Sequence, residues 1–133
     1  MSAVFGDAFY FLGLISRDDH AHSRCVAFSK HYRGHIITTS WILIEGGDAL
    51  AKPPHRDRAI RFFDWLPSQP RVRVTPATET LVRRGLDRYK SRRDKEWSLT
   101  DCISFVVMGD EGITEALTGD HDFEQAGFTI LLK

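Results

Sequence analysis

The segment EALTGDHDFEQAGFTILL (residues 115–132) places a group of acids between two short apolar runs. EALT predicts a strand, HDFEQA predicts one helical turn, and FTILL predicts a second strand. Asp120, Asp122 and Glu124 follow the first of these strands directly. Ligand sites of parallel α/β sheets form beyond the carboxyl ends of the strands. The segment therefore predicts both a parallel sheet and a chemical site at its edge.

The rest of the chain alternates strand and helix patterns in the same way. Three more short runs predict strands: AVFG (3–6), HIITT (35–39) and VRV (72–74). Helical patterns cover residues 8–15, 18–32, 41–51 after a Ser40 cap, 55–66, 75–89 and 99–112 after Ser98. Such alternation predicts an α/β fold, with three layers (α/β/α) about a central parallel five-stranded sheet. We expect one domain over residues 1–133.

Length and composition narrow the class of protein further. A chain of 133 residues with 42% hydrophobic residues can bury one sizeable core. Cys25 and Cys102 lie in apolar patterns without metal-type spacing, which favours reduced thiols in the cytoplasm. The N-terminus lacks a basic segment, and the apolar run 9–15 is too short to cross a bilayer. We therefore expect a cytoplasmic protein without membrane contact.

Three acids lie where a predicted helix begins. Asp7 follows the first strand, Asp120 follows the fourth, and Asp101 comes three residues after Ser98. Each has an alternative role as a helix cap, because a side-chain oxygen satisfies otherwise unpaired backbone N–H groups. Ser98 and Asp101 together have the pattern of a capping box. For any one of these acids alone, capping is the stronger interpretation.

Glu45 does not fit a capping role. It lies inside the helix after the second strand, with Trp41 and Ile42 as its neighbours one turn earlier. A carboxylate beside such residues is expected to be partly buried, and it then needs a partner or a metal ion. The helix offers no lysine or arginine at the right spacing. A solvated helix face is the alternative.

The four acids considered together favour a metal site. Carboxylates that converge without a cation repel one another, which raises their pKa values. Mg²⁺ and Mn²⁺ prefer oxygen ligands and can activate water against a phosphodiester. The sequence therefore predicts a shared pocket for one of these ions, formed by Asp7, Glu45, Asp101 and Asp120.

The order and spacing of these motifs resemble the PIN domain family of metal-dependent nucleases, which includes the VapC-type toxins. The resemblance rests on an acid after strand one, a glutamate in the helix after strand two, the SLTD helix start and LTGDHDF. It implies that the four acids are catalytic metal ligands. It further implies that Asp122 joins them near the metal-bound water, and that Thr118 and Ser98 support the site.

The resemblance also implies a function and partners. The expected activity is a ribonuclease dependent on Mg²⁺ or Mn²⁺, with cleavage that leaves a 5′-phosphate and a 3′-hydroxyl. The expected partners are an RNA substrate, a second copy in a homodimer, and an antitoxin that inserts a peptide into the active-site groove. Two features depart from the family: Ala8 replaces a frequent serine or threonine, and Gly46-Gly47 interrupts a helix. For the glycine pair, close helix packing is favoured over substrate approach.

A basic segment lies outside the acid motifs. Residues 83–95 carry seven basic and two acidic residues, whereas residues 96–133 carry eight acidic and one basic. The segment is a candidate for binding RNA phosphates, with Tyr89 available for stacking; an ordinary solvated helix and loop is an equal alternative. The candidate RNA contacts are Arg83, Arg84, Arg88, Arg92 and Arg93.

Two other functions stay open at this stage. The first is a PIN-like module that binds RNA or a partner protein without catalysis, which the departures at Ala8 and Gly46-Gly47 support. The second is a Mg²⁺-dependent phosphatase with an aspartyl nucleophile, which typically shows a DxD motif after its first strand. Here the first acid is followed by AFYF, and the DHD sequence comes near the end of the chain. The phosphatase is therefore disfavoured.

Overall fold

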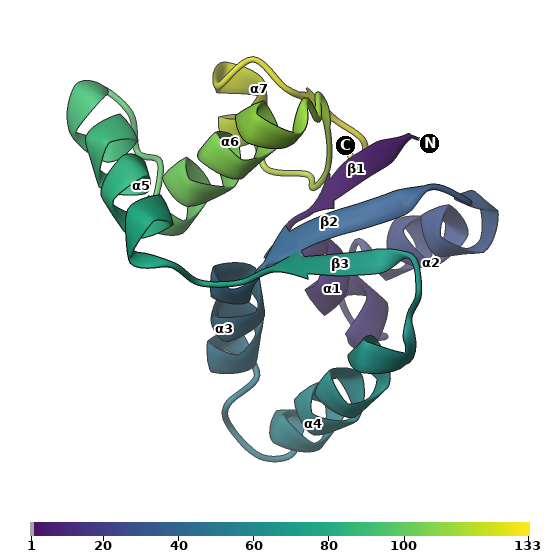
Figure 1. The fold of residues 1–133 in the computed structure, drawn as a ribbon. Helices are drawn as coiled ribbons and strands as arrows, with labels where there is room; N and C mark the ends of the chain where they lie inside the picture. The colour runs from purple at the N-terminus through teal and green to yellow at the C-terminus, as the bar shows by residue number, and fades with distance from the viewer. Residues whose placement is uncertain (1) are drawn as a thin grey trace.

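The computed structural model describes residues 2–133 and contains a five-stranded sheet in the order β3-β2-β1-β4-β5 (Figure 1). Every neighbouring pair of strands is parallel, as the alternating pattern predicts. The strands are β1 (Ala3–Gly6), β2 (His35–Thr39), β3 (Val72–Thr75), β4 (Glu115–Leu117) and β5 (Thr129–Ile130).

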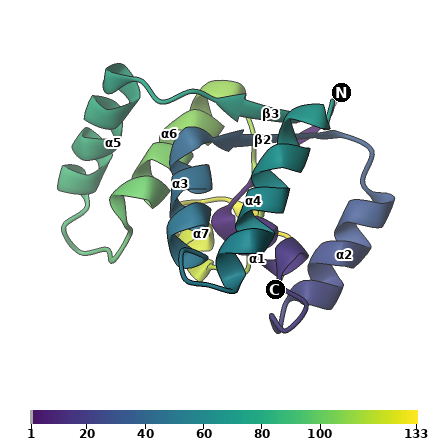
Figure 2. The same ribbon diagram turned by 90° about the horizontal axis from the view of Figure 1, so that it is seen from below.

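Helices cover both faces of this sheet, which confirms the three-layer prediction. The helices α1 to α4 lie on one face, whereas α6 and α7 lie on the other, with α5 packed against α6 (Figures 1 and 2). Their bounds are α1 (Ala8–Ile15), α2 (His22–His31), α3 (Ser40–Ala49), α4 (His55–Trp65), α5 (Glu79–Ser91), α6 (Leu99–Glu111) and α7 (His121–Gln125), with a short 3₁₀ turn η1 (Leu66–Ser68) after α4.

The core lies between the sheet and these helices. Phe5 of β1, Phe105 of α6 and Phe123 of α7 are almost fully buried, and the Phe123 ring centroid lies 6.3 Å from Phe5 and 5.1 Å from Phe105. Burying such a side chain contributes roughly 1.5–3 kcal/mol. Cys25 and Cys102 are buried free thiols, as expected. Among residues 2–133, no helix combines the length and the apolar character that crossing a bilayer requires.

Two elements are shorter than the sequence predicts. The pattern extends a helix over residues 18–32, but α2 begins at His22. The preceding residues instead form a turn, in which the Asp19 carboxylate accepts a hydrogen bond from the Ala21 backbone N–H at 2.8 Å. The run FTILL likewise contributes only two residues to β5.

Threonines cap two helices whose starts the sequence misplaces. The cap of α3 is Thr39 rather than Ser40, because the Thr39 hydroxyl accepts a hydrogen bond from the Ile42 N–H at 3.2 Å. α5 begins later than the Thr-Pro pair predicts, because Thr78 caps it by accepting from the Leu81 N–H at 3.2 Å. Such a cap contributes about 1 kcal/mol, enough to fix where a helix begins.

Two glycines allow helices to approach closely. A Cβ at Gly85 of α5 would clash with Ile103 of α6, so this glycine allows the two helices to pack. A Cβ at Gly47 of α3 would lie 3.2 Å from the Phe63 ring of α4. Gly46 has no such neighbour. Close helix packing therefore explains Gly47 but not Gly46.

Candidate active site

The strand order predicts a crevice between β1 and β4. The connections from β1 lead through β2 to β3 on one side, whereas β4 and β5 lie on the other side. A sheet whose order reverses in this way opens a crevice at the carboxyl ends of the strands on either side of the reversal. Asp7 follows β1 and Thr118 follows β4, so both lie at this reversal. The arrowheads of β2 and β3 in Figure 1 point to the same edge.

Asp7 is the most deeply buried acid of the crevice, with a side chain only 6% exposed. Although it precedes α1, its side chain makes no capping hydrogen bond, so the capping alternative is wrong for Asp7. Instead its Oδ2 accepts a hydrogen bond from the Thr118 hydroxyl at 2.8 Å. Burial raises the pKa of Asp7 to about 6, and the Glu45 and Asp120 carboxylates add to the rise.

Thr118 connects Asp7 to the loop that follows β4. Its buried hydroxyl donates to Asp7 and accepts a hydrogen bond from the Asp120 N–H at 3.1 Å. The Asp120 side chain in turn caps α7 by accepting from the Asp122 N–H at 2.9 Å. Capping therefore occurs at Asp120, but only Oδ1 takes part. Burial and the Asp120 carboxylate raise the pKa of Asp122.

Asp101 enters the crevice from the start of α6. The predicted capping box is present: the Ser98 hydroxyl accepts from the Asp101 N–H at 3.0 Å, and Asp101 Oδ2 accepts from the Ser98 N–H at 3.2 Å. Burial raises the pKa of the half-buried Asp101 to about 7 despite the Ser98 hydrogen bond, and Asp7, Asp120 and Asp122 add to the rise. The capping box fixes the carboxyl group among these acids.

Glu45 differs from its prediction in one respect. The residue is exposed rather than partly buried, although Ile42 three residues earlier is buried. The carboxyl group nevertheless lies toward the crevice. Desolvation raises its pKa, and the Asp101 and Asp120 carboxylates raise it further. Glu45 therefore borders the acid group from the side of α3.

No lysine or arginine pairs with this group within the described chain. None of the seven ion pairs among residues 2–133 includes Asp7, Glu45, Asp101, Asp120 or Asp122. Ligand atoms of Asp120, His121 and Asp122 lie within 4.8 Å of one another. The mutually repelling carboxylates supply oxygen ligands of the kind that a hard divalent cation prefers, and His121 adds a ring nitrogen beside two of them. The residues present therefore fit a hard divalent cation.

The five candidate RNA-binding arginines have unequal surroundings. Three of them form ion pairs: Arg83 with Glu79 at 3.3 Å, Arg84 with Asp110 at 2.6 and 2.8 Å, and Arg92 with Asp94 at 2.9 and 3.0 Å. Arg88 lies over the ring of Trp97, and Arg93 is exposed. These arginines therefore do not form one uniform basic face.

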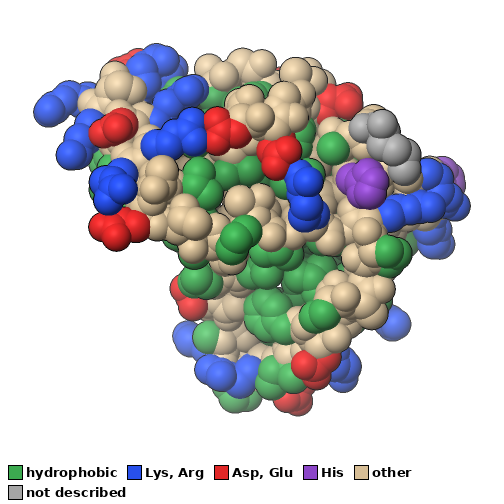
Figure 3. All heavy atoms as spheres, in the orientation of Figure 1, with side chains coloured by type: hydrophobic (Ala, Val, Ile, Leu, Met, Phe, Trp, Pro, Cys, Tyr) green, Lys and Arg blue, Asp and Glu red, His purple; other side chains and the backbone are tan. Residues whose placement is uncertain are grey.

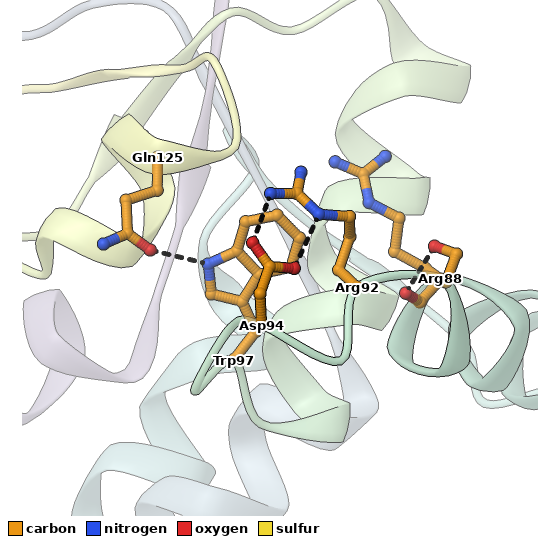
Figure 4. Close-up of polar contacts among 6 residues, drawn as sticks. Arg88, Arg92, Asp94, Trp97 and Gln125 are labelled. Carbon is orange, nitrogen blue, oxygen red and sulfur yellow. Dashed lines mark hydrogen bonds and ion pairs between the residues drawn. The ribbon is translucent and has the colours of Figure 1, made fainter.

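Sequence reasoning missed Trp97. This residue is 4% exposed, and its indole N–H donates to Gln125 Oε1 of α7 at 3.2 Å (Figure 4). Trp97 lies in the loop before α6, next to the Ser98 cap that positions Asp101. Gln125 lies in α7, the helix that Asp120 caps, so the bond joins these two segments. The sequence gives no local signal for a contact between residues so far apart. Trp97 thus connects two of the segments that supply acids.

A large groove lies away from the acids. This groove has a volume of about 1180 Å³ and is bordered by α1, α2, α4 and the start of β3. Its floor includes Phe11, Phe28 and Phe62, and Figure 3 shows hydrophobic side chains in the hollow. The rim carries arginines: Arg17, Arg33, Arg58, Arg61 and Arg71. The groove therefore combines an apolar floor with a basic rim.

Fold and site together define a parallel α/β protein with an acid-lined crevice. The PIN domain model matches residues 4–129, and the chain belongs to the PIN domain family. No curated protein sequence gives a significant match.

Solved structures share the whole fold. VapC20 of Mycobacterium tuberculosis, a Sarcin-Ricin loop cleaving toxin, is similar with a TM-score of 0.87 and 24% identity over 96% of this chain and 97% of that chain. VapBC2 of Rickettsia felis, bound to a DNA fragment from its promoter, has a TM-score of 0.69 and 11% identity over 98% of each chain. FitAcB of Neisseria gonorrhoeae has a TM-score of 0.68 and 14% identity over 96% of each chain.

Proposed function

We propose that the protein is a metal-dependent endoribonuclease of the PIN type, and the toxin of a toxin–antitoxin pair. The observation that carries the proposal is the group of acids at the sheet reversal, which repel one another and form no ion pair with a lysine or arginine among the described residues. Family membership and the fold shared with VapC20, a Sarcin-Ricin loop cleaving toxin, support cleavage as the reaction.

The proposed roles follow from the positions of the acids. Asp7, Asp101 and Asp120 hold Mg²⁺ or Mn²⁺, and Glu45 holds it directly or through water. When bound, the ion supplies a Lewis acid that polarises the phosphate and lowers the pKa of water. Thr118 fixes Asp7 through its hydroxyl, and Ser98 fixes Asp101 through the capping box.

Asp122 has a separate proposed role. It lies half-buried beside Asp120, and we assign to its carboxylate the role of accepting a proton from the attacking water. In-line attack would break the bond between phosphorus and the 3′ oxygen, which takes a proton from solvent, so the products carry a 5′-phosphate and a 3′-hydroxyl.

RNA cleavage by wild type, Asp7→Asn and Asp101→Asn tests the proposal. Wild type is expected to cleave in Mg²⁺ or Mn²⁺ and to stop in EDTA, and both variants are expected to be inactive. Binding of Mn²⁺, measured by calorimetry, should weaken in the same two variants. If all three proteins cleave equally and EDTA has no effect, the proposal is wrong. RNA binding that is indifferent to metal, without turnover, would instead favour the non-catalytic module.

We also propose two protein partners. An antitoxin segment is expected to cover the acid crevice, and the groove on the other side of the molecule offers a second contact for it. The apolar floor and arginine rim of that groove fit an acidic amphipathic segment.

The second partner is another copy of the chain. The helices α3 and α4 expose large hydrophobic side chains that are available for a homodimer contact: Ile44, Ile60, Phe63 and Trp65. Light scattering across a concentration series tests the dimer.

A further inference from the structure

Three cationic side chains lie over the ring of Trp97. The charged groups of Arg92, Arg88 and Lys95 lie 5.4, 5.5 and 5.9 Å from its ring centroid. Figure 4 shows Arg92 and Arg88 beside the indole, with Gln125 on the far side. Because α7 fixes the ring, the cations have a rigid surface on which to lie.

These cations exceed the acids that pair with them. In the described chain, Asp94 pairs with Arg92, whereas Arg88, Arg93 and Lys95 form no ion pair. Exposed pairs such as Arg92–Asp94 are weak, so a stronger anion can replace the carboxylate. A hollow of about 430 Å³ adjoins them, and its charged lining residues are Lys90, Arg92, Arg93 and Lys95 with one acid, Glu96. The surface therefore has an unbalanced positive charge beside a space that a ligand can enter.

Arg83 and Arg84 differ from this cluster. Arg83 pairs with Glu79 within α5, and Arg84 holds Asp110 of α6 in a two-bond contact. The Arg84 contact joins α5 to α6, so its role is structural. The two residues consequently do not add to the unbalanced charge.

The cluster lies beside the acid crevice. Trp97 directly precedes Ser98, the cap that fixes Asp101, and its hydrogen bond to Gln125 reaches α7. A polyanion that approaches the acids is repelled, and adjoining cations offset that repulsion. The acid crevice and the cation cluster are therefore close enough for one extended polyanion to contact both.

We propose that Arg88, Arg92, Arg93 and Lys95 form a clamp for the RNA backbone, with Tyr89 as an exposed stacking surface at its edge. The clamp binds phosphates next to the one that enters the acid crevice. This inference rests on the proposed ribonuclease function and narrows the RNA contacts by removing Arg83 and Arg84. Arginine and lysine neutralise phosphates, and an aromatic ring stacks on any base.

The test measures RNA binding by the Asp7→Asn protein in EDTA, so that cleavage does not interfere. The probe is a short fluorescent single-stranded RNA, titrated at several salt concentrations. Adding Arg93→Gln and Lys95→Gln should weaken binding by about tenfold or more and make it less dependent on salt. The matched control adds Arg83→Gln and Arg84→Gln, which removes the same charge from the same segment and should change binding less than about twofold.

Each outcome decides for or against the clamp. Equal effects of the two double substitutions, or no RNA binding by Asp7→Asn, would overturn it. Binding of a polyglutamate peptide in place of RNA would overturn it too, because the surface would then be a protein contact. Should wild type fail to cleave RNA while the Arg93 and Lys95 substitutions still abolish binding, the ribonuclease proposal fails and the clamp stands.

Discussion

The aspartates of the acid crevice and two surface aspartates, Asp94 before α6 and Asp110 within it, have opposite electrostatic environments. In the crevice, burial and neighbouring carboxylates raise the pKa of Asp7 to about 6 and that of Asp101 to about 7. On the surface, the Arg92 hydrogen bond lowers the pKa of Asp94 to about 2, and Arg84 lowers the pKa of Asp110. Arginines thus neutralise the surface acids and leave the crevice acids unpaired.

This difference indicates which acids serve the fold and which serve a ligand. Asp110 joins α6 to Arg84 of α5, and such a surface pair contributes little to stability. Asp7 and Asp101 oppose folding when ionised, because their charges are partly desolvated and unpaired. A bound cation would offset the repulsion between these carboxylates and so stabilise their arrangement. The predictions below test this division.

The largest expected effect is the loss of cleavage in Asp101→Asn. The substitution removes one charge from the crevice and keeps the shape of the side chain, so cleavage should fall by a factor of about 10³ or more. Asp110→Asn makes the same chemical change in the ion-paired region and should cleave within about twofold of wild type. Initial rates of RNA cleavage in Mg²⁺ compare the two. Equal losses would mean that the two regions do not differ in function.

A smaller loss is expected when the hydroxyl that fixes Asp7 is removed. Thr118→Val should reduce cleavage by about tenfold and stability by about 1–2 kcal/mol, because it leaves a buried carboxylate without its donor. Thr38→Val is the matched control, since the buried Thr38 hydroxyl donates to the Gly6 carbonyl at 2.8 Å. It should lose similar stability but less activity. Urea unfolding measures the stability of each variant, and initial rates measure its cleavage. If the two variants lose activity equally, Thr118 has no positioning role.

The metal-free protein should lose stability as the pH rises. Both crevice aspartates have folded pKa values above the ordinary 3.8, so the folded state holds their protons more tightly than the unfolded state. Their contribution is fully present below about pH 4 and is lost as the pH passes about 6 to 7. In EDTA, Tm should therefore fall between about pH 5 and about pH 8, and Mn²⁺ should reverse the fall at the upper pH only. A flat profile in EDTA would contradict the repulsion between the acids.

The smallest effect concerns the contact that joins the two regions. Trp97→Phe keeps an aromatic ring for the cations but removes the N–H that donates to Gln125. The cleavage rate should fall only severalfold, because one hydrogen bond is lost. We expect kcat to change more than KM. Gln125→Leu removes the other partner of the same bond and should behave alike. If KM changes more than kcat, Trp97 acts in RNA binding rather than in positioning α7.

The sequence predicts the fold well because its elements carry local signals. The parallel sheet follows from short apolar runs that alternate with helices, and the capping box of α6 is visible as SLTD. Element boundaries are less predictable. Thr39 rather than Ser40 caps α3, and only the geometry of the chain decides between two adjacent hydroxyl residues.

Side-chain environments are the part that the sequence does not reveal. Glu45 is exposed although Trp41 and Ile42 lie one turn away, because the orientation of α3 against the core decides burial. The Thr118 bond to Asp7 and the Trp97 bond to Gln125 join distant segments. The pairing of Arg84 with Asp110 likewise depends on how α5 packs against α6. Spacing alone therefore cannot separate free arginines from paired ones.

The most direct test of the account is a crystal structure of the protein with Mn²⁺ at about pH 8, where the crevice acids are ionised. An anomalous peak is expected in the crevice between β1 and β4, from an ion coordinated by oxygens of Asp7, Asp101 and Asp120. A crevice without that peak, or Mn²⁺ bound only at Asp94 and Asp110, would contradict it.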